Sequence, residues 1–273
     1  MLIDKYLTNN QLTEALNAAK DLVRAKPADS DGRSLLGLLY CFDAQWDKAD
    51  RQFTTAAQQS SELQVGVSLI RQLVRGEAAR QDFFFRGGVP ELMYEPDAAV
   101  EALFRAVISD REQNDDDVKV QVLKLQAGLP NLSGTVNRMP FEYARDLDDF
   151  LSQFLEIISL NGKYYLIPLR QVSSINFHKP EKLQDQIWRS ADLNLVSGFQ
   201  GVVYLPTCYC KAPSDDKLSD PLKLGGETDW VACGGDGPVR GRGQKMFLFG
   251  ETVLSMMELE AIEVVKESQN VPH

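Results

Sequence analysis

Few side chains in this chain of 273 residues are spaced for chemistry. Cys208 and Cys210 are separated by one residue, whereas zinc-binding cysteine pairs are usually separated by about two to four. His178 and His273 are the two histidines of the sequence, too few for a Ser-His-Asp triad. We therefore expect reduced thiols, no catalytic residue, and no metal ion or other cofactor.

A glycine-rich segment, Gly234–Lys245, carries several cations. Its Gly241-x-Gly243 pair lacks the third glycine of a dinucleotide-binding fingerprint, and the segment lacks the Gly-Lys-Ser/Thr of a phosphate-binding loop. We predict an architectural turn in which Arg240 and Arg242 are solvated. The alternative is that this loop belongs to an enzyme active site or a small-ligand site.

Carboxylates occur at two other places of interest. Asp146, Asp148 and Asp149 form a cluster that we interpret as the start of a helix, where acidic side chains stabilise the helix dipole, rather than as a metal site. Asp229 precedes Trp230, which we expect to pack on the core from a strand. In the small-ligand alternative, Asp229 would act together with the glycine-rich loop.

The charge of the chain restricts its partners. The formal net charge is −10 at pH 7, which argues against a nucleic-acid binder, because such proteins need a concentrated basic face. The sequence contains no run of about 18 apolar residues that would insert into a membrane. Its first residues lack the basic and apolar regions of a secretory signal, so we expect a cytoplasmic protein.

The N-terminal region contains a helical repeat. Ala15 and Ala19 precede Ala49 and Phe53 by 34 residues, the period of a tetratricopeptide repeat. The signature of that repeat comprises Leu36, Gly37, Tyr40, Ala49 and Phe53, with Arg33 and Ala56 also at the repeat spacing. Such repeats bury small residues between paired helices and leave a concave face for peptides or helices. A plain helical bundle is the alternative.

Apolar periodicity predicts helices up to about residue 128 and strands after residue 150. The predicted helices cover residues 11–25, 32–42, 47–60, 65–81, 98–109 and 118–129. The predicted strands cover residues 154–160, 163–168, 172–177, 192–196, 201–205, 228–232, 246–250 and 259–265. The fold class is therefore α+β: a tetratricopeptide-like helical domain (1–128), a linker (129–145) and a β-rich domain with a mixed sheet or partly open barrel (146–273).

Two short motifs predict local structure. Phe83-Phe84-Phe85 precedes two glycines and a proline that must break the helix, and we expect its rings to fill the core between two layers. Asn161-Gly162 separates two predicted strands. Because both residues accept a positive φ, this dipeptide predicts a tight hairpin.

The C-terminal half resembles the ImpE-like (TagJ-type) accessory proteins encoded with bacterial type VI secretion machines. Ordered blocks over roughly 105 residues carry this resemblance. They are DLDDFLSQFLEIISLNGKYYLIPLRQVSSINF from Asp146, KLQDQIW ending at Trp188, GFQGVVYLPTCY from Gly198, LGGETDW ending at Trp230, and GPVRGRGQKMFLFGE from Gly237 to Glu251.

This resemblance implies an accessory role without catalysis. Some members of the family look like binders of a contractile-sheath subunit, through the N-terminal helix of that subunit, with an indirect link to the ATPase that recycles the sheath. No catalytic residues transfer to this chain. The motif residues, whose role is open, are Trp188, Pro206, Asp229, Trp230, Arg240, Gly241, Gly243 and Gln244.

Together these features predict an adaptor whose helical domain offers a groove to a partner helix. The acidic balance of the chain would favour a partner with basic flanks.

Overall fold

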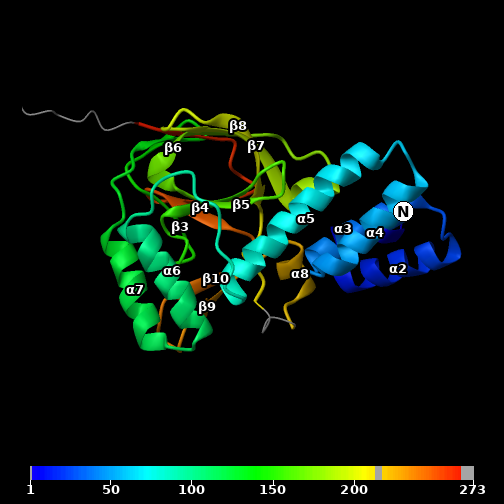
Figure 1. The fold of residues 1–273 in the computed structure, drawn as a ribbon, viewed down its shortest axis with the longest axis horizontal. Helices are drawn as coiled ribbons and strands as arrows, with labels where there is room; N and C mark the ends of the chain where they lie inside the picture. Colours follow the sequence, from blue (N-terminus) through cyan, green and yellow to red (C-terminus); the bar gives the residue numbers. More distant parts are fainter. Residues whose placement is uncertain (1, 213–216, 266–273) are drawn as a thin grey trace, which may run out of the picture.

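The N-terminal region is helical and the C-terminal region is built of strands (Figure 1). The computed structural model describes residues 2–212 and 217–265. Side-chain caps start three of the helices: Asp29 accepts the Gly32 N–H, Asp97 accepts the N–H groups of Ala99 and Val100, and Asn114 accepts the Asp117 N–H. The helices of this region are α1 (Leu2–Thr8), α2 (Leu12–Ala25), α3 (Ser30–Phe42), α4 (Trp46–Gln59), α5 (Gln64–Phe85), α6 (Ala98–Arg111) and α7 (Asp115–Ala127).

The strands that follow are short, and a small helix interrupts them. They are β1 (Gly134–Val136), β2 (Met139–Phe141), β3 (Ala144–Asp146), β4 (Phe154–Ile158), β5 (Tyr164–Pro168), β6 (Val172–Phe177), β7 (Trp188–Leu195), β8 (Gln200–Pro206), β9 (Thr228–Ala232), β10 (Val239–Gly243), β11 (Met246–Phe249), β12 (Thr252–Ser255) and β13 (Ala261–Val264), with helix α8 (Asp220–Lys223) between β8 and β9.

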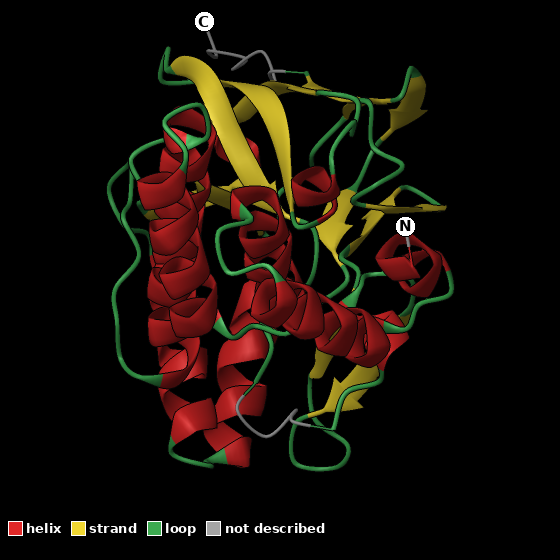
Figure 2. Ribbon diagram, turned by 90° about the vertical axis from the view of Figure 1, so that its right-hand side faces the viewer, coloured by secondary structure: helices red, strands yellow, loops and turns green. Residues whose placement is uncertain are grey.

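The strands form one large sheet and two small ones. The large sheet has the order β2-β1-β13-β6-β7-β8-β4-β5, and the small sheets are β10-β9 and β12-β11-β3. All pairs between these strands are antiparallel, and the isolated bridge between Glu91 and Tyr165 is parallel. Figure 2 shows strands at the top and right of the view and most helices at the left and centre, with the N-terminal helix at the right.

The helical region and the large sheet share one hydrophobic core. Strand β4 is buried on both faces: Phe154 and Ile158 belong to the cluster that includes the helices, whereas Leu155 and Ile157 belong to a second cluster among the strands. The predicted α+β fold with a helical front and a β-rich back is confirmed. The shared core means that the two regions pack as one body.

The repeat-signature residues lie in the packed interface between α3 and α4. Ala49 and Phe53 of α4 are fully buried, and Leu36 of α3 is nearly so. A Cβ atom on Gly37 would lie 2.6 Å from a carbon of the Phe53 ring, so only glycine allows this approach. These side chains therefore hold the helix pair together and are not available to a partner.

The boundaries of several elements differ from the prediction. Residues 129–145, predicted as a linker, contain β1 and β2 and lead into β3, because alternate residues such as Gly134, Val136 and Phe141 are buried. Helix α5 continues through Phe85 instead of ending before Phe83, since Phe83 and Phe84 lie on its buried side and fill the core as predicted. Helix α1 and strands β10 and β12 were not predicted; β10 lies in the glycine-rich segment that was predicted as a turn.

One further local prediction, the hairpin, is confirmed. Strands β4 and β5 form the hairpin expected at Asn161-Gly162, where Gly162 has a φ of +78°. In residues 2–212 and 217–265, no helix combines the length and apolarity that a membrane span requires.

Candidate interaction site

A cluster of buried charges joins the helical region to the strands. Arg80 of α5 makes two hydrogen bonds of 2.8 Å to Glu156 of β4. Lys245 Nζ lies 2.9 Å from the same carboxylate and 2.8 Å from Asp146 of β3. Glu77 lies 3.2 Å from Arg80. All five side chains are almost completely buried, so their mutual pairing is what makes their burial tolerable.

Neutral donors satisfy the remaining oxygens of these carboxylates. Tyr164 donates to Glu156, Tyr209 to Asp146 and Trp188 to Glu77, over 2.7, 2.8 and 3.1 Å. Every carboxylate of the cluster thus has several partners within the protein. These contacts fix the position of α5 relative to the strands.

The pKa values in this cluster follow from burial and pairing. Burial raises the pKa of Asp146 to about 6, although the charge of Lys245 opposes this effect. Burial also raises the pKa of Glu77, against the charge of Arg80. Burial opposes ionisation of Glu156 as well, but the charges of Arg80 and Lys245 outweigh it and lower the pKa of Glu156. The pKa is thus raised for two of the three carboxylates, Asp146 and Glu77, and lowered for Glu156, which pairs with both cations.

The acidic run at 146–149 does not start a helix, contrary to the prediction. Asp146 is the last residue of β3, and Asp148 follows it in a turn where its carboxylate accepts the N–H of Phe150. Asp148 also pairs with Arg240 at 2.9 Å, and Asp149 pairs with Arg145 at 2.6 Å. Asp146 and Asp148 therefore supply counter-charges to Lys245 and Arg240, which are 99 and 92 residues away and which local sequence cannot show.

The glycine-rich segment is a turn followed by β10, but its cations are not all solvated as predicted. The side chain of Arg240 is 14% exposed and lies over the Phe150 ring at 4.2 Å. Lys245 is fully buried in the charge cluster. Arg242 is partly buried. Nearby carboxylates thus neutralise Arg240 and Lys245, which removes them from any phosphate-binding role.

The family-motif residues separate into two groups. Trp188, at the start of β7, is buried, and Gly241 lies so close to Tyr209 that a Cβ atom would be 2.2 Å from its ring. Asp229 and Trp230, on β9, are exposed instead; Trp230 was predicted to pack on the core but is 39% exposed and stands against the Tyr209 ring at 5.8 Å.

Three other motif residues lie in or beside residues 206–211, which we call the Tyr209 segment. Pro206 ends β8 and lines a cavity beside the charge cluster. Gly243 has a φ of +79°, and Gln244 forms a bridge with Cys208. Trp188 thus contacts the charge cluster directly through Glu77. Gly241, Gly243 and Gln244 contact the Tyr209 segment beside it.

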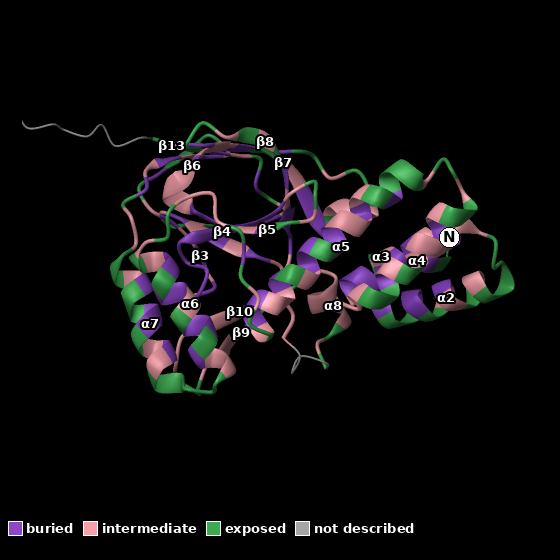
Figure 3. Cartoon of the chain, in the orientation of Figure 1, coloured by how far each residue is buried: buried purple, intermediate pink, exposed green. Residues whose placement is uncertain are grey.

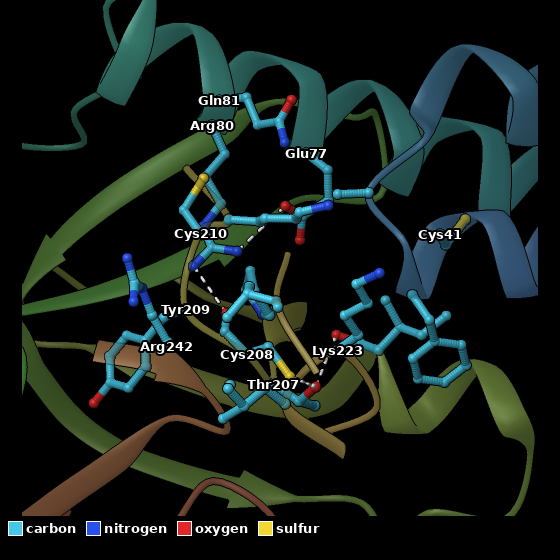
Figure 4. A pocket seen from close by; sticks show the side chains of 18 of the residues that line it. Cys41, Glu77, Arg80, Gln81, Thr207, Cys208, Tyr209, Cys210, Lys223 and Arg242 are labelled. Atoms are coloured by element: carbon cyan, nitrogen blue, oxygen red, sulfur yellow. Dashed lines mark hydrogen bonds and ion pairs between the residues drawn. The ribbon is translucent and has the colours of Figure 1, made fainter. Parts of the chain in front are cut away.

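The cavity lies where α3 and α5 meet the Tyr209 segment (Figure 4). It holds about 60 Å³, enough for a few water molecules. Cys41, Cys208 and Cys210 contribute to its wall. Burial raises the pKa of Cys208 to about 11 and that of Cys210 to about 12, so both thiols stay protonated at neutral pH.

Neither of these two thiols is therefore an activated nucleophile. The described cysteines are all free, and no cluster of His, Cys, Asp and Glu in residues 2–212 and 217–265 is arranged to hold a metal ion. His178 is exposed beside Asp192, away from the thiols, and His273 lies outside the described residues.

One face of α5 is covered along its C-terminal half. Val65, Leu69, Gln72, Gly76 and Phe83 share this face, because they are three, four or seven residues apart. Gly76 packs against β4, where a Cβ atom would lie 2.3 Å from Ile158, and Phe83 is 3% exposed. The strands thus occupy this end of the face.

The N-terminal half of the same face is open. Val65 is 83% exposed and lines a shallow groove with Leu69 and Gln72. Leu160, at the tip of the β4–β5 hairpin, forms the other wall and is 55% exposed. Figure 3 shows the N-terminal end of α5 largely exposed, with buried residues farther along the helix. We call this groove the α5 groove; its lining residues are Gln64, Val65, Ser68, Leu69, Gln72 and Leu160.

Comparisons with known proteins agree with this fold. Residues 138–263 match the model of the family described as ImpE protein. The predicted resemblance to ImpE-like proteins is confirmed. The ImpE region begins within the segment predicted as a linker, in agreement with the strands found there.

Two relatives extend the similarity beyond the ImpE region. Over 258 residues, the chain is 29% identical to the type VI secretion system accessory component TagJ of Pseudomonas aeruginosa, which covers 93% of this chain and 88% of that protein. The crystal structure of protein VPA1032 from Vibrio parahaemolyticus has a TM-score of 0.91 and 26% identity, and the match covers 98% of this chain and 99% of that one.

Sequence reasoning missed the residues that matter most at both sites. Glu77 and Arg80 lie outside the family blocks, and Glu156 lies within the first block but was not singled out. The available signal was a charge on an otherwise apolar helix face or strand. Val65 and Leu160 look like ordinary apolar residues in the sequence. Val65 is exposed because the strands cover only the C-terminal half of this face of α5. Leu160 is exposed because it lies at the tip of the β4–β5 hairpin.

Proposed function

We propose that this protein is a non-catalytic, cytoplasmic accessory protein of a type VI secretion system that binds a helix of a partner protein. The partner we propose is the contractile-sheath subunit, through its N-terminal helix, with an indirect link to the ATPase that recycles the sheath. The similarity to TagJ, a protein named as an accessory component of that system, supports the general role.

The observation that carries the helix-binding proposal is the open half of the α5 face. Its apolar side chains, Val65, Leu69 and Leu160, are exposed or half-exposed at a position where the same face, farther along, is filled by β4. An amphipathic helix buries apolar residues three and four positions apart in such a groove. The α5 groove is therefore the place where a partner helix would complete the packing of α5.

An enzymatic role has less support. The cations of the glycine-rich segment that would bind an anionic substrate, Arg240 and Lys245, pair with Asp148, Asp146 and Glu156. The thiols of the cavity stay protonated. These contacts support a structural role for the glycine-rich segment.

Calorimetry of the intact protein with a synthetic peptide of the cognate sheath subunit's N-terminal helix tests the proposal. We expect micromolar affinity, about −8 kcal/mol, and a negative heat-capacity change from apolar burial. Val65→Asp should weaken binding at least tenfold, because it places a charge in the apolar contact.

Val253→Asp is the matched control. Val253 is 47% exposed on β12, outside the α5 groove, and its substitution should leave the affinity unchanged. Equal effects of the two substitutions would reject the α5 groove. Absence of binding by the wild-type protein would reject the sheath helix as the partner.

A further inference from the structure

The α5 groove is bordered by arginines. A second shallow groove, between α4 and α5, shares Gln64, Ser68 and Gln72 with it and carries Arg71 and Arg75. Among the described residues that line the two grooves there is no aspartate or glutamate. This surface is thus locally basic on a chain whose formal net charge is −10.

The two arginines differ in whether a carboxylate of this chain pairs with them. Arg71 makes two hydrogen bonds to Asp50, of 2.6 and 3.1 Å, so this pair is internally neutral. Arg75 is exposed and donates a 3.1 Å hydrogen bond to the neutral Gln72. Arg75 therefore presents the positive charge of this surface to a partner.

We infer that the helix bound in the α5 groove carries an acidic side chain beside its apolar face, and that this side chain pairs with Arg75. The inference rests on the proposed function, because it specifies the chemistry of the partner helix. Val65 and Arg75 are ten residues apart on α5, which is about 15 Å at 1.5 Å per residue. A partner helix of about three turns therefore reaches both the apolar contact and the arginine.

The charges that line the contact, and not the net charge of the chain, determine which charge the partner helix should carry. At physiological ionic strength the Debye length is about 8 Å, so exposed charges farther away are largely screened. The acidic balance predicted a partner with basic flanks, whereas the residues that line the contact favour an acidic flank. The same contact would place like charges together if the partner helix carried lysines at that flank.

Peptide titration against two charge-reversal variants tests this inference. The probe is the sheath subunit's N-terminal helix peptide, in its native form and with its acidic residues changed to the corresponding amides. We expect Arg75→Glu to weaken binding of the native peptide by about 3- to 10-fold, and the amide peptide to bind the wild-type protein more weakly by a similar factor. The effect of Arg75→Glu should shrink for the amide peptide and in high salt.

Arg105→Glu is the control, because Arg105 is also exposed, lies on α6, and its reversal changes the net charge of the chain equally. Equal weakening by both variants would show that net charge acts instead of Arg75 and would overturn the inference. Native binding that neither Arg75→Glu nor the amide peptide changes would also overturn it, and the proposed function would stand. If the wild-type protein does not bind the native peptide, the proposed function fails and this inference fails with it.

Discussion

At the scale of single residues, the decisive feature is the buried cluster of charges at the joint. Two cations, Arg80 and Lys245, face three carboxylates within a core that is otherwise apolar. Such a cluster adds little net stability compared with apolar side chains of the same size, but removal of one member leaves a buried charge without a partner. Its contribution is to fix how α5 meets β4.

The titration of Asp146 gives a prediction for stability against pH. Its folded pKa of about 6 lies above the ordinary value of 3.8, so the folded chain holds a proton that the unfolded chain releases. The free energy of unfolding should therefore fall as the pH rises through about 6, by at most about 1.4 kcal/mol per pH unit for this group. Glu156 acts in the opposite sense, but below about pH 4.5.

Asp146→Asn should reduce the slope of unfolding free energy between about pH 5 and 7, measured by urea denaturation. The residual slope has a further source, because Glu77 also has a raised pKa. An unchanged slope in Asp146→Asn would contradict the assignment of the titration to this residue.

At the scale of elements, α5 connects the two halves of the molecule. One side of α5 packs on α4, while another face passes from the open α5 groove to the contact with β4. The repeat-like pair α3–α4 supports this helix, since the small residues Gly37 and Ala49 allow α3 and α4 to approach closely, with Gly37 against the Phe53 ring.

Ala49→Leu should destabilise the protein by about 1–3 kcal/mol, because a fully buried alanine in the α3–α4 contact gains three heavy atoms. Thermal or chemical unfolding measures this cost. The control is Ala79→Leu, a substitution at an exposed position of α5, where we expect a change within about 0.5 kcal/mol. Matching unfolding curves for the two variants would show that the α3–α4 contact is loose.

At the scale of the whole molecule, the helical region depends on the strands to complete its hydrophobic core. The shared core extends from the helices to Phe154, Ile158 and Trp188. Glu77 and Arg80 would face water if the strands were removed, together with the apolar residues that surround them. The few repeats present cannot cover their own apolar faces.

A fragment of residues 1–128 should therefore lack cooperative unfolding, although circular dichroism should still detect helix in it. The intact chain under the same conditions should unfold in one transition, because its core is continuous. A fragment that melts sharply at the temperature of the intact chain would show that the helical region is independently stable, and would support the predicted division at residue 128.

The sequence by itself determined the helices with a clear apolar period, the hairpin at Asn161-Gly162 and the family resemblance, because these depend on residues near one another in the chain. It did not place Arg240 beside Asp148, 92 residues earlier, or Lys245 beside Glu156. Nor did it show that Val65 and Leu160 border one groove. Tertiary structure decided these features, because burial of a charge or exposure of an apolar side chain depends on which distant segment packs against it.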